Sequence, residues 1–418
     1  MLFFKKVTIK NFFNLSLNQF LNLLLSFLLI PIIFRSIGPE NFGLVNLSLT
    51  IVYLLSIAVT YGYNLNGPKL IADIKNEKKE LEKLVNEIIS IRLFIAITIF
   101  LAVILLYILF GNYTDYWIIL LSSLIVLFSE AIYPIFYLQG KDKINILIVL
   151  NLISKLIYFV LIVLFIKNPE DSFLINLIFG LTCLFSYCFF WIYIFKKELF
   201  NWTFPSLKNL KLKIKQNFHY FISTISSYII FNAGIIIVSN FIDESELGQF
   251  SLSQKIGLQL RMIPVFIIQS VLQKATILGK KKNNFFLNNY LNKIHYNGIY
   301  LTIFIGICVV FSSKIIIYFL AGEHIVYSKN ILIILGLLPF FASLNTKNTL
   351  IMLINEKKRI LNYAITLTAL IMVFLCLIGS YMYGGYGVCL ALIITEIFSF
   401  IIHSYLIKKE NIYNLKIS

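Results

Sequence analysis

Apolar segments of about twenty residues follow one another along almost the whole chain, and this feature limits its possible folds most strongly. A helix of about 20 residues crosses the roughly 30 Å hydrocarbon layer of a bilayer. We count twelve such segments, at about 12–34, 41–65, 86–110, 115–138, 144–166, 172–195, 217–241, 247–272, 295–320, 327–352, 360–382 and 386–407. Charged residues make up 13% of the chain, whereas soluble domains carry about 25%. The sequence predicts an all-α polytopic membrane protein with twelve transmembrane helices.

Lysine and arginine are unevenly distributed between the connections of these segments. Most of the 36 basic residues lie at the termini and in every second connection, and the remaining connections carry only Arg35, Lys167, Lys314 and Lys329. Because cytoplasmic connections are enriched in basic residues, both termini are predicted to be cytoplasmic. The same bias accounts for the net charge of +17, so no nucleic-acid partner is expected. The first apolar segment is too long for a signal-peptide core and is predicted to be an uncleaved anchor.

A short motif recurs at about half the chain length. Ile37-Gly38-Pro39-Glu40-Asn41-Phe42-Gly43 is matched, in degraded form, by Ile242-Asp243-Glu244-Ser245-Glu246-Leu247-Gly248. The repeat predicts two six-helix bundles, residues 1–206 and 207–418, which run in parallel because six is an even number of spans. Proline suits a first helical position, an early glutamate suits the positive helix end, and glycines permit close helix approach. We therefore interpret five residues of the two motif copies as architectural, namely Gly38, Pro39, Glu40, Gly43 and Gly248.

Ionisable residues inside the predicted spans are the strongest functional signal. There are seven: Arg92, Glu130, Lys155, Lys255, Arg261, Lys347 and Glu396. A charge at the bilayer centre costs about 2.5–3.5 kcal/mol, so most should face a bundle interior or water. Five of the seven are basic, and pairing with the two acidic residues leaves positive charge. This surplus suits an anionic ligand.

These residues define candidate binding positions. Arg261 and Lys255 lie on the predicted helix 247–272, where a guanidinium would match phosphate oxygens. Further candidates are Arg92, Lys155 and Lys347, although Arg92 and Lys347 have the alternative of extending their side chains to the inner surface. Another set, Asn14, Asn18 and Asn22, forms a polar stripe that either joins helices or lines a wet cavity. Glu130 and Glu396 either pair with cations or carry a coupling proton or sodium ion.

No feature of the sequence predicts bond-making chemistry. The chain has no Gly-x-x-x-x-Gly-Lys-Ser/Thr phosphate loop, and its four histidines are scattered without ligand spacing. The five cysteines lack metal-binding spacing and are interpreted as small core residues. We therefore predict a carrier without cofactor or metal, and not an enzyme.

Three stretches at helix ends resemble one family. They are Gly38-Pro39-Glu40-Asn41-Phe42-Gly43, Tyr61-Gly62-Tyr63-Asn64-Leu65-Asn66 and Tyr137-Leu138-Gln139-Gly140-Lys141-Asp142-Lys143. In this order the chain resembles Wzx-type O-antigen flippases of the multidrug/oligosaccharidyl-lipid/polysaccharide (MOP) exporter superfamily. It departs from the family at Gly67-Pro68, where small residues such as Ser-Ala are frequent, and at Asp243-Glu244, which replaces the glycine and proline of the first motif copy.

The resemblance implies a MATE-like fold and a cargo. The cargo would be an undecaprenyl-pyrophosphate-linked oligosaccharide, moved from the cytoplasmic to the periplasmic leaflet of a bacterial inner membrane. Implied partners are this lipid-linked oligosaccharide, membrane lipid, and the polysaccharide polymerase and chain-length proteins. The alternatives are a cation-coupled multidrug exporter, a lipid II-type flippase, and a membrane glycosyltransferase or polymerase. A multidrug exporter is expected to have an acidic residue in the first or seventh helix, and a lipid II-type flippase is expected to have two further helices. A glycosyltransferase or polymerase is expected to have one large periplasmic loop. The sequence has none of these features.

Overall fold

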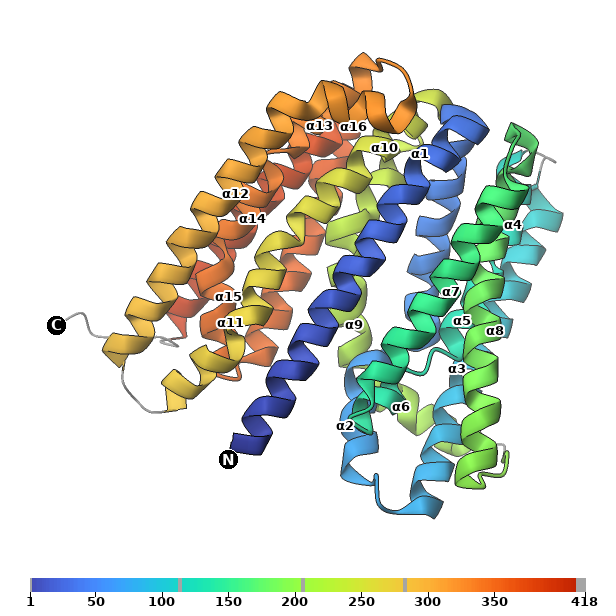
Figure 1. The fold of residues 1–418 in the computed structure, drawn as a ribbon, viewed down its shortest axis with the longest axis vertical. Helices are drawn as coiled ribbons and strands as arrows, with labels where there is room; N and C mark the ends of the chain where they lie inside the picture. Colours follow the sequence, from blue (N-terminus) through green and yellow to red (C-terminus); the bar gives the residue numbers. More distant parts are fainter. Residues whose placement is uncertain (1, 112–114, 204–206, 281–283, 411–418) are drawn as a thin grey trace. The chain divides into compact units, whose positions relative to one another are not determined.

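The computed structural model describes residues 2–111, 115–203, 207–280 and 284–410, with side chains from residue 27 onward apart from those of 115, 207–216, 280, 284 and 358. Figure 1 shows the chain as helices joined by short connections. The helices before the middle of the chain are α1 (Leu2–Thr60), α2 (Tyr63–Asp73), α3 (Lys78–Phe110), α4 (Asp115–Ser123), α5 (Ile125–Ala131), α6 (Ile135–Gly140), α7 (Ile144–Phe165), η1 (Pro169–Asp171) and α8 (Ser172–Glu198). Those that follow are α9 (Leu207–Val238), α10 (Glu244–Arg261), α11 (Ile263–Lys280), α12 (Asn284–Ala321), α13 (Val326–Leu335), α14 (Leu338–Leu344), α15 (Thr346–Ile354) and α16 (Lys358–Lys409).

Ten helical stretches among the described residues are long and apolar enough to cross a membrane. Two of them, Phe27–Asp73 and Arg359–Lys409, are 47 and 51 residues long. At about 1.5 Å per residue each would be roughly 70 Å or longer if straight, more than twice the thickness of a hydrocarbon layer. The chain is thus a polytopic helical membrane protein, as predicted, and the number twelve itself stays a prediction.

Glycines break the two longest helices. Gly38 in α1 has φ 76° and ψ 172°, and Gly384 in α16 has φ 54° and ψ −132°. A positive φ is accessible to glycine without the steric cost that a Cβ atom brings. Figure 1 shows the dark blue part of α1 running away from the N-terminus and its lighter part running back. The predicted turn at Gly38-Pro39 therefore lies where the first two predicted spans meet.

Several predicted continuous helices are broken in the structure. The span predicted at 115–138 consists of α4, α5 and α6, with Pro134 before α6, and the span predicted at 327–352 consists of α13, α14 and α15, with Pro339 early in α14. The span predicted at 247–272 divides at Met262, ahead of Pro264. Proline has no N–H to donate and disfavours helical backbone in the preceding residue, which explains the breaks before α6, α11 and α14.

The second predicted span, 41–65, also ends early, and it does so without a proline. Helix α1 stops at Thr60, and the next two residues have positive φ angles, 42° at Tyr61 and 75° at Gly62. A Cβ atom on Gly62 would lie 2.6 Å from Cβ of Tyr220, so the close packing of α9 here requires glycine. The breaks affect the second and fourth spans of each half of the sequence, which supports the internal repeat.

Internal contacts divide the chain into two compact units, Met1–Ile225 and Ser226–Ser418. The division lies within α9, so the first part of α9 belongs to unit 1 and its remainder to unit 2. The core of unit 1 contains Phe136, Tyr137 and Trp191, and Trp191 donates to the carbonyl oxygen of Ile132 at 2.7 Å. The assignment of six-helix bundles to residues 1–206 and 207–418 stays a prediction.

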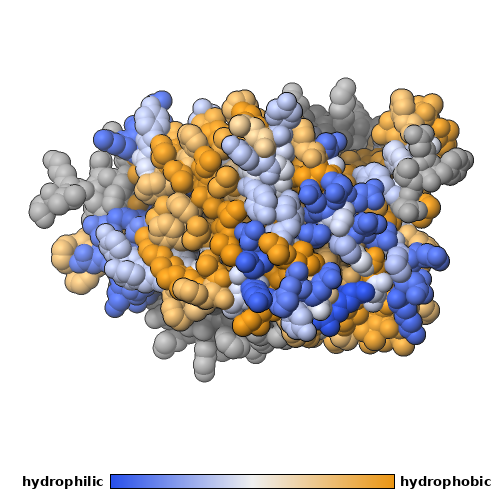
Figure 2. Space-filling view, turned by 90° about the horizontal axis from the view of Figure 1, so that it is seen from above, coloured by the Kyte–Doolittle hydropathy of each residue, from blue (hydrophilic) through white to orange (hydrophobic). Residues whose placement is uncertain are grey.

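The surface is apolar along many helices. Large hydrophobic side chains are exposed in both units, for example Phe110 and Phe189 in unit 1 and Phe311 and Tyr381 in unit 2. Soluble monomers rarely expose apolar patches on this scale, whereas lipid-facing helices require them. Figure 2 shows the molecule from above the view of Figure 1. On this face hydrophilic residues gather, with hydrophobic residues between and around them. Two cysteines, Cys188 and Cys308, are part of the exposed surface, so their predicted place in the core is wrong.

Candidate functional site

Arg92 of α3 is enclosed inside unit 1. Its side chain has no exposed surface, and its guanidinium donates from Nη2 to Oδ1 of Asn64 at 2.9 Å and from Nη1 to the carbonyl oxygen of Tyr133 at 3.3 Å. The same group lies 4.8 Å from the ring centroid of Phe136 and 5.8 Å from that of Tyr63. Aromatic faces stabilise a desolvated cation. The alternative in which Arg92 extends to the inner surface does not fit this arrangement.

The cage around Arg92 uses one stretch that carries the family resemblance and the residues just before another. Asn64 lies in the first stretch, at the start of α2, and Phe136 of α6 directly precedes the Tyr137–Lys143 stretch. A Cβ atom on Gly67 would lie 2.7 Å from Cβ of Phe136, so these short helices pack closely. The Gly67-Pro68 departure from the family pattern therefore has a packing reason, since only glycine leaves room for Phe136. Segments far apart in sequence thus meet at one buried cation.

A cavity of about 240 Å³ lies close to this cage within unit 1. Its charged lining residues are Glu130 of α5 and Lys155 of α7. Glu130 interacts electrostatically with Arg92, and its carboxylate is hydrogen-bonded to no side chain that the structure describes. The polar and aromatic remainder of the lining is Tyr53, Ser129, Tyr133, Asn151, Ser154, Phe179, Cys183 and Tyr187. Such a lining offers both charges and hydrogen bonds to a polar group or to water.

Arg261 and Glu396 form a buried ion pair in unit 2. Both Nε and Nη2 of Arg261 approach Oε1 of Glu396, and the two side chains are 9% and 7% exposed. The guanidinium also lies 3.8 Å from the ring centroid of Phe231, while its Nη1 is buried and has no hydrogen-bond partner among the described residues. The pair occupies the edge of the guanidinium that a bidentate phosphate would use. For Glu396, the geometry matches the predicted alternative of pairing with a cation.

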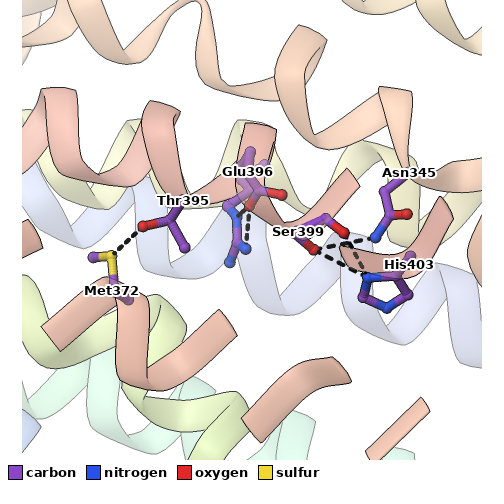
Figure 3. A network of polar contacts seen from close by, with 7 residues as sticks. Asn345, Met372, Thr395, Glu396, Ser399 and His403 are labelled. Carbon is purple, nitrogen blue, oxygen red and sulfur yellow. Dashed lines mark hydrogen bonds and ion pairs between the residues drawn. The ribbon is translucent and has the colours of Figure 1, made fainter. Parts of the chain in front are cut away.

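A second polar cluster follows Glu396 along α16, as Figure 3 shows. Asn345, between α14 and α15, donates from Nδ2 to Oγ of Ser399 at 3.2 Å, while its buried Oδ1 has no hydrogen-bond partner in the part of the chain that the structure describes. One turn further on, Nδ1 of His403 lies 2.7 Å from the carbonyl oxygen of Ser399. Before Glu396, Oγ1 of Thr395 lies 3.2 Å from the sulfur of Met372. The break in the fourth span of unit 2 thus places a polar side chain against α16.

The two remaining lysine candidates of unit 2 are half-buried. Lys347 of α15 donates to Oδ1 of Asn292 at 2.6 Å and to Oδ1 of Asn288 at 3.3 Å, both on α12. This bonding between helices replaces the predicted alternative of a lysine extended to the inner surface. Lys255 of α10 is adjacent to the buried Gln254, whose Nε2 has no hydrogen-bond partner within the described ranges.

Other predicted positions have simpler outcomes. The side chains of Asn14, Asn18 and Asn22 lie outside the described residues. In the architectural motif, Gly38 forms the break in α1, Glu40 is exposed, and Gly43 and Gly248 are buried. The second copy of the motif begins α10 at Asp243, whose Oδ1 accepts from the backbone N–H of Glu246 at 2.7 Å. An aspartate before a helix provides this cap, which explains why Asp-Glu can replace Gly-Pro.

Sequence reasoning did not identify the partners of these charges. Asn64 was visible within a motif, but no local signal connected it with Arg92, 28 residues later. The pairing of Arg261 with Glu396 joins residues 135 positions apart, and the asparagines around Lys347 lie on another helix. A charge inside a predicted span indicates that a partner is needed. Only the packing of the helices identifies that partner.

Comparisons with known proteins place this arrangement in a family. The model of the family described as "Polysaccharide biosynthesis protein" matches residues 8–273. Relatives from Escherichia coli K12 and Shigella dysenteriae, each named "Putative O-antigen transporter", are 23% and 25% identical over 399 residues. These alignments cover 93% of this chain, and 93% and 97% of the two relatives.

Solved structures of similar fold include two kinds of transporter. The lipid II flippase MurJ in an inward closed conformation has a TM-score of 0.77 at 18% identity, covering 94% of this chain and 87% of that one. A multidrug resistance MATE family transporter of the MOP superfamily, in an inward-facing conformation, has a TM-score of 0.73 at 15% identity, covering 92% and 94%. The fold therefore defines a multi-pass helical membrane protein of the type found in MATE transporters and MurJ.

Within that class, the family match decides the assignment. It extends over more than half of the chain and includes Arg92, the cavity of unit 1 and the ion-paired Arg261. The chain belongs to the polysaccharide biosynthesis protein family.

Proposed function

We propose that this chain is a flippase for an undecaprenyl-pyrophosphate-linked oligosaccharide, an O-antigen or related repeat unit. It would move this lipid from the cytoplasmic to the periplasmic leaflet of a bacterial inner membrane, with both of its own termini in the cytoplasm. The observation that carries the proposal is the family match over residues 8–273. The names of the two relatives that align with 93% of the chain point to the same class of cargo.

The mechanism that we propose is alternating access between two six-helix bundles, residues 1–206 and 207–418, in parallel repeat. Twelve spans result if the two longest helical stretches, which break at Gly38 and Gly384, each cross the membrane twice. Breaks within the second and fourth spans would allow short helices to shift without unfolding a whole span.

The basic candidates divide into two roles in this proposal. Lys155 and Lys255 are half-buried and would contact the pyrophosphate, because a lysine ammonium can follow a moving phosphate. Arg92 and Arg261 are enclosed by their own units and would hold helices in place. Lys347 would join them in that role through its two asparagine partners. The stripe of Asn14, Asn18 and Asn22 would bind sugar hydroxyls.

The two acidic residues differ in the same way. Glu396 is paired with Arg261, which supports a structural role. Glu130 borders the cavity of unit 1 and lacks a hydrogen bond to the side chains that the structure describes, so it is the better candidate for carrying a coupling proton or sodium ion. A carboxylate that gains and loses a cation must be reached by water, and a cavity permits this.

The test is a translocation assay in proteoliposomes that contain a labelled lipid-pyrophosphate oligosaccharide in one leaflet. The wild-type chain should move the label to the opposite leaflet faster than empty vesicles do. Lys255→Gln and Lys155→Gln should reduce the initial rate, whereas Lys167→Gln, which removes an exposed lysine from the connection after α7, should not. Wild-type translocation at a rate that neither Lys255→Gln nor Lys155→Gln changes would leave the function but remove these two residues from the site. No translocation by the wild type would contradict the proposal.

A further inference from the structure

A second cavity, of about 330 Å³, lies in unit 2 where α12 ends and α13 begins. Three of its lining residues carry basic groups, Lys314 on α12, His324 in the connection and Lys329 on α13. The other lining residues are apolar, namely Ile317, Ile325 and Val326. The space is several times the roughly 30 Å³ that one water molecule occupies in the liquid. It can therefore hold a polar group of substantial size.

The charged residues that line this cavity have one sign. Among the described residues, none of the three basic side chains takes part in a hydrogen bond between side chains or in an ion pair, although the ring of His324 packs 4.9 Å from that of Tyr318. The acidic residue nearest in sequence, Glu323, is exposed and forms no ion pair with them. The N-terminus of α13 adds the positive end of a helix dipole at the same place. An anion entering the cavity would meet cations and, among the described lining residues, no acidic side chain.

The position makes this cluster unusual. The positive-inside pattern assigns this end of the helices to the outside, where connections carry few basic residues. Lys314 and Lys329 are nevertheless both at this one cavity. Lys314 precedes the end of α12 by seven residues, which places its Cα about 10 Å below that end. Its long side chain can reach the interface from there.

The surface beside the cavity is apolar and faces outward. Phe311 and Ile315, one turn below and beside Lys314 on α12, are 84% and 70% exposed, and Val326 at the rim is 66% exposed. A soluble anion would gain nothing from such a surface, whereas a lipid would place acyl chains along it. Acyl chains along α12 with a phosphate in the cavity would use both features.

We infer that this cavity of Lys314, His324 and Lys329 binds the phosphate group of an anionic lipid in the adjoining leaflet. The inference rests on the proposed function in one respect only: the proposed cytoplasmic position of both termini identifies that leaflet as the periplasmic one. The binding itself is measured without transport, so failure of one proposal can be distinguished from failure of the other.

The experiment is native mass spectrometry of the full chain in detergent, titrated with phosphatidylglycerol or phosphatidylcholine. Phosphatidylglycerol should form a first adduct at lower concentration than phosphatidylcholine. Removing one lysine contact, by Lys329→Gln or Lys314→Gln, should weaken that adduct about fivefold, and the double variant about 25-fold. Lys329→Arg should retain the binding because the charge remains.

The controls separate this site from general charge effects and from a free anion. Lys167→Gln removes an exposed lysine that is not among the residues lining this cavity and should change the affinity less than about twofold. An equal loss in Lys167→Gln, or equal affinity for the two lipids, would overturn the inference. Inorganic phosphate is the second probe. If phosphate alone displaced the lipid with the same dependence on Lys314 and Lys329, the cavity would be a site for phosphate ions and the lipid assignment would be wrong.

Discussion

Replacing Glu396 by glutamine should destabilise unit 2 strongly. The change keeps the size of the side chain but leaves the charge of Arg261 uncompensated in a place where both partners are less than one tenth exposed. Removing one partner of a buried ion pair costs about 3–5 kcal/mol. The ring of Phe231 does not reduce this loss, because its contact with the cation, worth about 2 kcal/mol for a desolvated cation over an aromatic face, is already present in the wild type. We therefore expect the free energy of unfolding to fall by about 3–5 kcal/mol.

The measurement is reversible unfolding of the purified chain in mixed micelles, carried out as a double-mutant cycle. Arg261→Met, Glu396→Gln and the double variant are compared with the wild type. The double variant should lose less unfolding free energy than the sum of the losses in the two single variants. The difference, which is the coupling between the neighbouring sites, should be about 2 kcal/mol or more. The matched control is Asp142→Asn, which breaks the exposed pair with Lys75, whose side chains are 77% and 44% exposed. Exposed pairs contribute about 0–1 kcal/mol.

Two results would refute this reasoning. A loss in Glu396→Gln no larger than that in Asp142→Asn would mean that the pair is hydrated in the folded protein. Additive effects of the two single variants would mean that Arg261 and Glu396 do not depend on each other. If the cycle gives the expected coupling and the double variant still translocates lipid, Arg261 has a positioning role alone.

Three further predictions concern backbone and cage residues. Gly38→Ala should cost about 1–2 kcal/mol in unfolding free energy, because its φ of 76° is strained for alanine although no atom lies within 4 Å of the added Cβ; stability equal to that of the wild type would contradict the break in α1. Gly67→Ala should cost about 1–3 kcal/mol because the added Cβ would lie 2.7 Å from Cβ of Phe136, and Phe136→Leu in the same chain, which keeps that Cβ, should not restore the loss; a stability of Gly67→Ala equal to that of the wild type would contradict the packing of α2 on α6. Arg92→Lys keeps the charge but loses the fork that reaches both Asn64 and Tyr133, so the unfolding free energy should fall by about 1.5–3 kcal/mol; an unchanged value would mean that one contact is sufficient.

The sequence was sufficient for the class of fold because the bilayer imposes it. Apolar runs of about twenty residues have few folded solutions in lipid, and helices satisfy their own backbone groups. The break at Gly38 was also predictable, since glycine followed by proline ends one helix and begins another. Pro134 and Pro339 are visible in the sequence, but both lie within apolar runs that were each predicted to form one continuous helix. Hydrophobicity alone does not distinguish one long helix from three short ones.

The candidate site was predictable as a set of charges and unpredictable as a geometry. Arg92, Arg261 and Lys347 were identified because charge inside a membrane is costly. Their partners come from helices brought together by packing, as with Asn64 for Arg92 and Glu396 for Arg261. No periodicity within one helix contains this information. The result changes the roles of both arginines, from expected ligands of phosphate to proposed supports of the fold.

The measurement that tests the account most directly is a comparison of three cargoes in the same proteoliposomes. A lipid-pyrophosphate oligosaccharide, lipid II and a cationic dye are presented to the wild-type chain under identical ionic conditions, with empty vesicles as the control. Our account predicts that the lipid-linked oligosaccharide crosses much faster than in empty vesicles and that the dye does not. Transport of the dye, with no movement of the oligosaccharide, would contradict the proposed function and favour a multidrug exporter, and movement of lipid II alone would favour a lipid II-type flippase.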